Sequence, residues 1–481
     1  MQCMDFQALL QKEQKNIERV RAEEPEFFTR DTQVDDEETL KQVGILGLPK
    51  NRPLGYIKLW PQDFVVEEIN KEGNIHTVEL KEEGGVNGDL AGSPNGEAGK
   101  TIYADLVKVG LSTIDVRAEL ASVLDIDEKF IGTAGIKDRD ALTSQLISFR
   151  NVGKDAVASL SFPNFFLKNV RQGKGAVERG MLRGNRFTIT VRTKGGADTS
   201  KIESAIKDTG KSGFWNFYYL QRFGTPRLLT HIWGLYILQG EYEIAVKTMM
   251  TREGAREVPF FKELRRQAGA RWGDWQAMEE IFELFPLSFR SEIEMLKYLK
   301  GSPEDFRGAL AQIPQQVQLG VYAYSSFLFN SLLSTYIQKG ENPPEEFPLF
   351  LSRNRDHQNL YRKFFEKHNL RLPSPAFRDF PFVQWAGHFI PTKATVEVHN
   401  YKVQDNVVVV DFSLPKGSYA TSFLSNIFTL SSGLPVLRGI KTDKIDAFEI
   451  LGKGSLGPTL DRFKDVILSK VKDELSANEE A

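Results

Sequence analysis

The stretch KFIGTAGIKDRDALTSQLISF, residues 129–149, decides the fold class of this chain. Its outer parts, KFIGTAGI and SQLISF, have the apolar and β-branched composition of strands, and the polar turn KDRDA separates them. The small residues Gly132, Ala134 and Gly135 allow another backbone or a ligand to approach closely. We therefore expect a sheet, with Lys137–Asp140 on a loop at its edge.

Further strand patterns lie on both sides of this stretch. They are YIKLW, DFVVEEI, HTVELK and TIYADLVKVG upstream, and FLKNV, RFTITVR, ATVEVHN and NVVVVDFSL downstream. The Gly-rich and Asn-rich segment Gly84–Gly99 is expected to be a loop between two strands. Residues 228–340 are mainly helical in pattern and include the apolar segment VYAYSSFLFNSLLSTYI, which is typical of a buried helix. Strand-rich segments around a helical block predict the α+β class.

The composition is that of an ordinary globular protein. The chain has 481 residues, 41% of them hydrophobic, and 62 Lys and Arg against 64 Asp and Glu, which gives a formal charge of −2. This length predicts two or three domains. The single cysteine, Cys3, excludes a disulfide framework and a cysteine-based metal site. No apolar run is long enough for a membrane span, so we expect a cytoplasmic protein.

Two segments resemble nucleotide-binding motifs, and both fail on context. GKGSLG at 452–457 matches GxGxxG, but a proline follows and too little chain remains for a dinucleotide fold. NGEAGKT at 95–101 resembles a phosphate loop, but Pro94 stands where the motif requires glycine. The six histidines show no paired helical spacing with a carboxylate. We expect neither a metal nor a nucleotide cofactor.

A basic segment is the only local feature that suggests a polyanion partner. Between residues 168 and 194, eight cations stand against the single acid Glu178. Such a segment is either a solvated hairpin face or a contact surface for nucleic acid, and charge alone leaves both open. The cations are Lys168, Lys174, Lys194, Arg171, Arg179, Arg183, Arg186 and Arg192.

The predicted loop at 137–140 carries the strongest candidate for chemistry. Asp138 lies between Lys137 and Arg139, and neighbouring cations favour the ionised carboxylate. An ionised carboxylate can act as a nucleophile or as a base. The alternative is a charged turn in which Asp138 caps its own backbone.

Read together, six segments resemble the TruD family of tRNA pseudouridine synthases. They occur in the family's order: PQDFVVEEI, LVKVGLST, GTAGIKDRDALTSQ, RGNRFTITVR, WNFYYLQRFG and LPKGSYAT. They cover roughly residues 50–225 and 400–430. The chain departs from the family at Tyr219, where a small residue is usual, and at Ser425 and Asn426, where Arg and Glu are expected.

The resemblance implies the pseudouridine synthase fold, an α+β fold with a mixed, mostly antiparallel sheet. It implies a discontinuous catalytic domain at 49–225 and 399–475, interrupted by a largely helical TRUD-type insertion domain at 226–398. The resemblance does not explain residues 1–48, which we expect, from their richness in Glu, Gln, Lys and Arg, to form an N-terminal helical extension. The activity it implies is the conversion of uridine to pseudouridine, at uridine 13 of tRNA, without a metal or cofactor. The alternative is a non-catalytic protein that binds or folds RNA.

By the same resemblance, Asp138 is the catalytic residue, and Asp140 is a weaker candidate. The target base must be unstacked to be reached, and Phe64 and Phe187 are the aromatic residues expected to line its pocket. The full set of residues expected to bind the substrate RNA is Lys58, Phe64, Glu68, Lys108, Lys137, Asn185, Phe187, Asn216, Gln221, Arg222 and Phe223.

Overall fold

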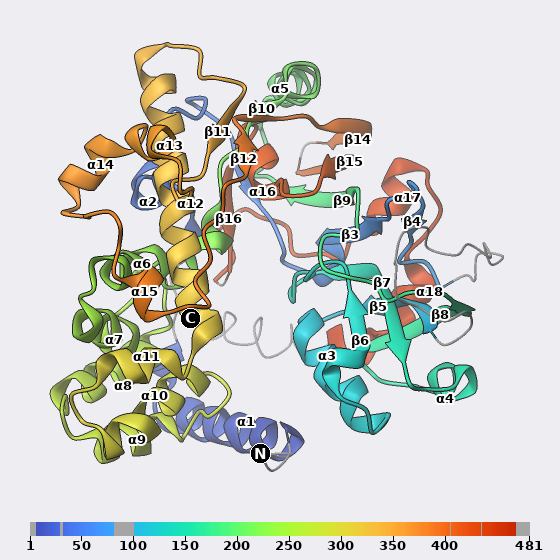
Figure 1. Cartoon of the computed structure of the whole chain (residues 1–481). Helices are drawn as coiled ribbons and strands as arrows, with labels where there is room; N and C mark the ends of the chain where they lie inside the picture. The colour runs from blue at the N-terminus through green and yellow to red at the C-terminus, as the bar shows by residue number, and fades with distance from the viewer. Residues whose placement is uncertain (1–5, 29–31, 81–100, 405, 434, 468–481) are drawn as a thin grey trace. The chain divides into compact units, whose positions relative to one another are not determined.

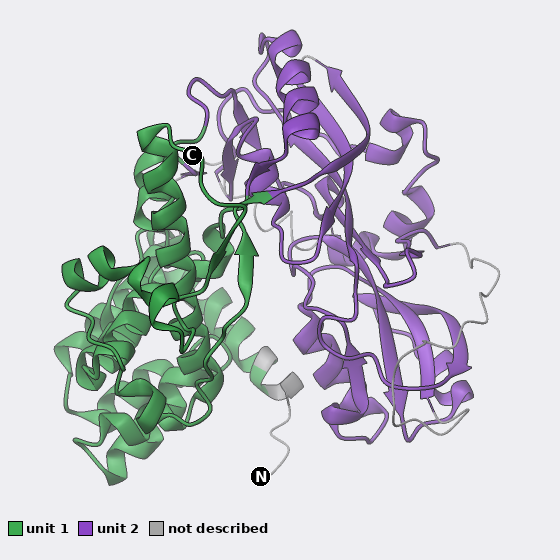
Figure 2. Ribbon diagram, turned by 45° about the horizontal axis from the view of Figure 1, so that its top comes forward, with its two compact units in different colours: residues 1–31, 36–48, 216–393 green, residues 32–35, 49–215, 394–481 purple. Residues whose placement is uncertain are grey.

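The structure, a computed structural model, describes residues 6–28, 32–80, 101–404, 406–433 and 435–467. The chain forms two compact units (Figure 2). Unit 1 comprises residues 1–31, 36–48 and 216–393, and unit 2 comprises residues 32–35, 49–215 and 394–481. Unit 1 is mainly helical and unit 2 is built on a sheet, which confirms the predicted α+β class. The assignment of a catalytic and an insertion domain stays a prediction.

Within the described residues, unit 2 contains a 12-stranded sheet (Figure 1). Its main path runs β1-β16-β2-β9-β3-β7-β5-β8; β15 pairs with β9 and β14, while β4 pairs with β3 and β6 with β7. The strands are β1 (Gln33–Val34), β2 (Leu54–Tyr56), β3 (Phe64–Ile69), β4 (Ile75–His76), β5 (Thr101–Lys108), β6 (Ile131–Thr133), β7 (Leu142–Arg150), β8 (Phe165–Gly173), β9 (Gly184–Arg192), β14 (Glu397–Gln404), β15 (Val407–Pro415) and β16 (Thr429–Ser432).

Most neighbouring strands in this sheet are antiparallel. The parallel pairs among the described strands are β3 with β7 and β16 with β2. The β3–β7 pairing is short and joins Val65–Glu67 of β3 to Leu142–Ser144 of β7. Beyond it, β3 pairs with β4. The sheet is therefore mixed and mostly antiparallel, as the sequence resemblance implied.

Helices cover both faces of the sheet near β5. Leu106 belongs to a core that includes Val116 and Leu120 of helix α3 (Thr113–Val123). The next residue, Val107, belongs to a second core that includes Phe448 of α17 (Ala447–Leu451). Successive strand residues point to opposite faces, and both faces are covered here, so every residue of β5 is buried. The remaining helices of unit 2 are α4 (Lys154–Ala158), α5 (Thr199–Ser212), α16 (Ala420–Leu424) and α18 (Gly457–Arg462).

The pattern HTVELK predicts a strand, but among its described residues only His76, the last residue of β4 (Ile75–His76), is in one. Two further predicted strands are also shorter than their sequence patterns. In YIKLW the strand ends at Tyr56, because Lys58 adopts a left-handed conformation with φ of 61°. In KFIGTAGI only Ile131–Thr133 form a strand. Gly132 is required there, because a Cβ atom at this position would lie 2.2 Å from the carbonyl oxygen of Val177. Both differences lie beside the loop that carries Asp138.

A buried ion pair joins two segments of unit 2. Arg192 at the end of β9 donates two hydrogen bonds to the carboxylate of Asp63, at 2.9 and 3.0 Å, and a third to the carbonyl of Lys441. Both side chains of the pair have no exposed surface. The pair fixes the turn that leads into Phe64 and β3.

Unit 1 is organised around the long helix α12 (Pro314–Lys339). Asn330 of this helix donates to the carbonyls of Val43 and Tyr218 and accepts from the amide of Tyr218, so it ties two loops to the helix. The other helices are α1 (Phe6–Glu23), α2 (Glu37–Gln42), α6 (Thr230–Gln239), α7 (Tyr242–Thr251), α8 (Pro259–Ala270), α9 (Trp275–Phe282), α10 (Arg290–Gly301), α11 (Phe306–Ala311), α13 (Arg355–Asn359), α14 (Arg362–Lys367) and α15 (Ala376–Asp379). In unit 1, β11 (Glu346–Pro348) pairs with β12 (Phe389–Pro391). The short strands β10 (Phe214–Trp215) and β13 (Lys393–Ala394) lie where the chain passes from one unit to the other.

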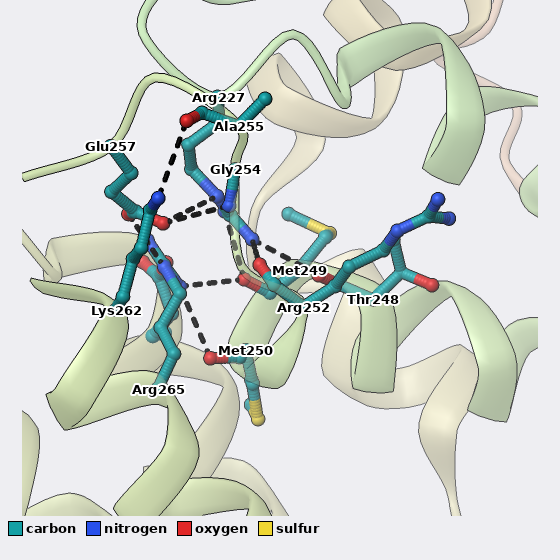
Figure 3. A network of polar contacts seen from close by, with 11 residues as sticks. Arg227, Thr248, Met249, Met250, Arg252, Gly254, Ala255, Glu257, Lys262 and Arg265 are labelled. Atoms are coloured by element: carbon teal, nitrogen blue, oxygen red, sulfur yellow. Dashed lines mark hydrogen bonds and ion pairs between the residues drawn. The ribbon is translucent and has the colours of Figure 1, made fainter. Parts of the chain in front are cut away.

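A buried charged network closes the end of α7 in unit 1 (Figure 3). Arg265 donates to Glu257 at 2.8 Å, and Arg227 lies 3.7 Å from the same carboxylate. Both guanidinium groups also donate to backbone carbonyls at and just after the C-terminal end of α7. These carbonyls belong to Thr248, Met249, Met250 and Arg252. The network therefore stabilises the end of α7.

Some expectations fall outside the described residues. They are the loop at Gly84–Gly99, Cys3, and NGEAGKT up to Lys100. In the part of the chain that the structure covers, no helix is both long and apolar enough to cross a membrane.

Candidate active site

Asp138 lies on the loop between β6 and β7, and 39% of its side chain is exposed. The base of this loop is fixed to the start of α3 by one threonine. The hydroxyl of Thr113 accepts from the amide of Lys137 at 2.9 Å and donates to Gln145 at 2.8 Å. Gln145 in turn donates to the carbonyl of Gly135 at 3.0 Å. The loop thus presents its carboxylate to solvent from a fixed base.

Lys108, the last residue of β5, holds the backbone of the same loop from within. Its side chain is buried, and its ammonium group donates to the carbonyls of Leu111 and Asp138 at 2.7 Å and of Lys137 at 3.4 Å. Burial lowers the pKa of Lys108 to about 7, although the nearby charge of Asp138 opposes this shift. Lys108 therefore positions the loop and does not face solvent.

Lys58 is the cation that contacts the Asp138 side chain. Its Nζ atom lies 2.9 Å from Oδ2 of Asp138 and 4.2 Å from the ring centroid of Phe64. The left-handed backbone of Lys58 is uncommon for a residue with a side chain and costs about 1–3 kcal/mol, a strain often found at functional sites. The sequence neighbours Lys137 and Arg139, which we expected to set the charge of Asp138, point elsewhere.

Lys137 connects Glu68 of β3 to Asn185 of β9. Its buried ammonium group lies 2.6 Å from Oε2 of Glu68 and donates to Oδ1 of Asn185 at 2.7 Å. The other oxygen of Glu68 accepts from the amide of Leu146 at 3.2 Å. Glu68 therefore bridges the gap that opens where β3 leaves β7. Arg139 instead donates to the carbonyl of Gly110 at 3.3 Å.

The two expected pocket aromatics pack against each other. Phe64 and Phe187 are 2% and 7% exposed, and their rings meet edge to face with centroids 6.2 Å apart. Phe412 of β15, which sequence reasoning did not select, stacks on Phe187 at 5.3 Å. Little ring surface remains open in this structure. The role of both rings in holding a base stays a prediction.

Four of the eight cations in the basic segment make contacts within the protein. Lys168 donates to Thr77 and to the carbonyl of Glu79, Arg171 lies 3.6 Å from Asp105, Arg186 pairs with Asp411, and Arg192 pairs with Asp63. The exposed members are Lys174, Arg179, Arg183 and Lys194. Neither sequence-based interpretation, a solvated face or a contact surface, holds for the whole segment.

The other four expected RNA-binding residues belong to unit 1. Asn216 donates to the carbonyl of Pro391, and Arg222 donates to Ser326 of α12 at 3.0 Å. Phe223 is fully buried and packs edge to face on His231, while Gln221 is exposed. Their part in RNA binding stays a prediction, and any part of Phe223 would be indirect.

The departures from the family pattern have local structural partners. The side chains of Ser425 and Asn426 both donate to the carbonyl of Ser422, at 2.9 and 2.7 Å. They therefore close the end of α16. Tyr219 is buried in unit 1.

The rejected motif GKGSLG has a structural use in unit 2. Gly452 ends α17 in a left-handed conformation, and Lys453 lies 2.9 Å from Asp411. Among the described residues, no group of three or more His, Cys, Asp or Glu side chains is arranged to hold a metal ion.

Comparison with known proteins gives one consistent result. Residues 50–348, more than half of the chain, match the sequence model of the family described as tRNA pseudouridine synthase D (TruD). A relative from Methanopyrus kandleri, named as a probable tRNA pseudouridine synthase D, is 31% identical over 67% of this chain and 84% of its own length. A second, from Methanocaldococcus jannaschii, is 28% identical over 77% of this chain and 94% of its own length.

A solved structure agrees at the level of the fold. A crystal structure assigned to tRNA pseudouridine synthase D of Methanosarcina mazei superposes with a TM-score of 0.56 and 23% sequence identity, covering 81% of this chain and 97% of that one. The matched residues 50–348 include the loop of Asp138 and its partners Lys58, Lys108 and Asn185. The chain belongs to the tRNA pseudouridine synthase D (TruD) family.

Proposed function

We propose that this protein converts uridine to pseudouridine in tRNA, at uridine 13, with Asp138 as the catalytic carboxylate. The observation that carries the proposal is a partly exposed carboxylate, paired with Lys58 at 2.9 Å, on a loop whose backbone Lys108 holds from below. The names of the relatives supply the substrate class. A protein that only binds RNA, without turnover, would not need a carboxylate held in this way.

The proposed reaction is an isomerisation, so substrate and product contain the same atoms. It needs one carboxylate. The bond between C1′ of the ribose and N1 of uracil breaks, the base turns, and a bond forms between C1′ and C5. The proton on C5 leaves, and N1 gains a proton. Asp138 either attacks C1′, forming an ester bond that breaks when C5 bonds to C1′, or removes a ribose C2′ proton that it returns to C2′ when C5 bonds to C1′. Both routes require the ionised form beside the sugar.

The exposed cations of the basic segment are the proposed contacts to the RNA backbone. Lys174, Arg179 and Arg183 have no internal ion pair among the described residues and lie on or beside the segment that joins β8 to β9. This segment contacts the catalytic loop, because the amide of Gly180 donates to the carbonyl of Ala134 at 2.7 Å. Phosphate contacts of this kind position an RNA without reading its sequence.

The test is to incubate the protein with unmodified tRNA transcripts and to map pseudouridine. We expect pseudouridine at position 13, and none at that position in transcripts that carry cytidine there. Binding of the same transcripts is measured in parallel. Binding without pseudouridine would favour the RNA-binding rival, and pseudouridine at another position would refute the assignment to uridine 13 alone.

The pKa of Lys108 predicts an alkaline loss of activity. Because burial lowers this pKa to about 7, the group is an ammonium ion below that pH and a neutral amine above it. The neutral amine donates one hydrogen bond fewer to the loop carbonyls, so we expect the rate to fall about tenfold between pH 7 and pH 9. Rates are measured across this range for wild type and Lys108→Arg.

The arginine variant separates Lys108 from other titrating groups. A guanidinium group keeps its charge throughout the range, so the variant should lose the alkaline fall while working at a lower rate overall. Ionisation of uridine itself affects both proteins equally. An identical fall in the variant would show that Lys108 does not cause it.

A further inference from the structure

Two apolar side chains are exposed beside the loop of Asp138. Ile136 lies two positions before Asp138 and is 66% exposed, the largest exposure of any large hydrophobic residue that the structure describes. Ile114 is 53% exposed and follows Thr113, whose hydroxyl accepts from the amide of Lys137 at 2.9 Å. The two isoleucines are therefore chain neighbours of one hydrogen bond at the base of this loop.

The backbone on both sides of Ile136 is held in place. On one side, the carbonyl of Gly135 accepts from Gln145 at 3.0 Å. On the other side, the amide of Lys137 donates to Thr113. A β-branched side chain also has little freedom about χ1. Ile136 therefore presents its side chain to solvent in a nearly fixed direction, and covering it with another molecule costs little conformational entropy.

The loop turns Ile136 and the catalytic candidate outward together. Lys137, between them, is 5% exposed and contacts Glu68 at 2.6 Å, whereas the side chain of Asp138 is 39% exposed. The space beside Ile136 is open, because a Cβ atom at Gly135 would meet only Nζ of Lys137, at 3.9 Å. The isoleucine and the carboxylate are thus both accessible to one bound molecule.

The spacing of these two residues fits the geometry of an opened base stack. Two positions of a protein chain span at most about 7 Å. An unstacked base leaves a gap of two stacking steps of about 3.4 Å each between its neighbours. When the ribose of an unstacked uridine lies at Asp138, the gap that its base has left is therefore within reach of Ile136.

We propose that Ile136 enters the gap that the target uridine leaves in the base stack of the tRNA, and so keeps the uridine unstacked while Asp138 acts on it. This inference rests on the proposed function. Unstacking costs free energy, and the neighbouring bases close the gap unless something fills it. Apolar wedges such as isoleucine separate base steps because they cover base faces without needing hydrogen bonds. Burial of the exposed side chain between two bases offsets part of the cost.

The test removes the side chain and the stack separately. One tRNA carries its normal bases beside the target uridine, and a second carries an abasic residue next to it. On the normal tRNA, Ile136→Ala should lower the single-turnover rate about tenfold, because most of the buried apolar surface is lost. On the abasic tRNA there is no complete stack to hold open. The rates of Ile136→Ala and wild type on that tRNA should therefore agree within about twofold.

A second measurement follows the stack without turnover. 2-Aminopurine, whose fluorescence rises when it is unstacked, replaces a base beside the target uridine, and the protein carries Asp138→Asn so that the substrate stays unmodified. Binding of this tRNA should raise the fluorescence. Adding Ile136→Ala should reduce the rise at least about twofold, because the neighbouring bases close again. This result decides the question even if the abasic tRNA is a poor substrate.

Two variants separate the proposed role from a loss of apolar surface in general. Val123 lies at the end of α3 and is 57% exposed, so Val123→Ala removes a similar exposed side chain from the same unit. It should leave the rate on the normal tRNA within about twofold of wild type. Ile136→Leu keeps the apolar volume and should retain at least about a third of the wild-type rate. Thermal unfolding of Ile136→Ala should match wild type, because the side chain is exposed.

The outcomes distinguish this inference from the proposed function. If Ile136→Ala modified the normal tRNA as fast as wild type, or left the 2-aminopurine signal unchanged, the wedge would be wrong while the proposed function stands. An equal loss of rate on the normal and abasic tRNAs would also contradict the wedge. No pseudouridine from wild type on the normal tRNA would refute the proposed function and this inference with it.

Discussion

Replacing Asp138 with asparagine should lower pseudouridine formation by at least about 10³- to 10⁴-fold, because the amide can neither attack the sugar nor remove its proton. Asparagine has the same shape and can still accept a hydrogen bond from Lys58, which lies 2.9 Å away. Binding of tRNA should therefore change by less than about threefold, the effect of one exposed charge. Single-turnover rates and a binding titration measure the two quantities.

The same loop provides a matched control. Asp140 is exposed and lies two residues further along the loop, and it was the weaker candidate on sequence grounds. Asp140→Asn makes the same chemical change, and we expect it to alter the rate by less than about fivefold, which is within the effect of an exposed charge. If Asp140→Asn abolished activity and Asp138→Asn did not, the catalytic assignment would move to Asp140.

Replacing Asp63 with asparagine should lower the free energy of unfolding by about 3–5 kcal/mol, the cost of leaving a buried charge without its partner. Arg192 donates to both oxygens of Asp63, and neither side chain has exposed surface. An asparagine can accept one of these hydrogen bonds but cannot neutralise the cation. The midpoint and slope of urea unfolding give the change.

Two controls test the explanation. Glu203→Gln breaks the exposed pair of Glu203 and Lys207 on α5 and should change stability by less than about 0.5 kcal/mol. The double variant Asp63→Asn/Arg192→Met removes both charges and should recover part of the loss. A loss of stability from Asp63→Asn below about 1 kcal/mol would mean that water or another group stabilises the Arg192 cation in place of the lost carboxylate.

Much of the fold was readable from local patterns. The strands at TIYADLVKVG, RFTITVR and NVVVVDFSL form β5, β9 and β15, because alternating β-branched residues suit an extended chain wherever they are placed. The strand ends near the loop of Asp138 were not readable. The left-handed backbone of Lys58 had no local signal. The close approach at Gly132 was expected from the sequence, and the structure added its partner, the carbonyl of Val177.

The basic segment shows the limit of reading charge along a chain. Eight cations within 27 positions look like one surface, yet four of them turn inward to Asp63, Asp105, Asp411 and the β4 region. The four inward cations lie on strands, Lys168 and Arg171 on β8 and Arg186 and Arg192 on β9, whereas the four exposed ones lie outside these strands. Which members face solvent depends on where the acids of other strands lie.

The sequence by itself determined the α+β class, the family and the choice of Asp138, because motifs in a fixed order carry that information without coordinates. Only the tertiary structure decided the partners. Lys58 pairs with Asp138, Lys108 holds its backbone, and Lys137 turns to Glu68 and Asn185. The physical reason is that an ion pair depends on distance in space, and the sheet brings residue 58 to within 2.9 Å of residue 138 while directing the adjacent Lys137 elsewhere.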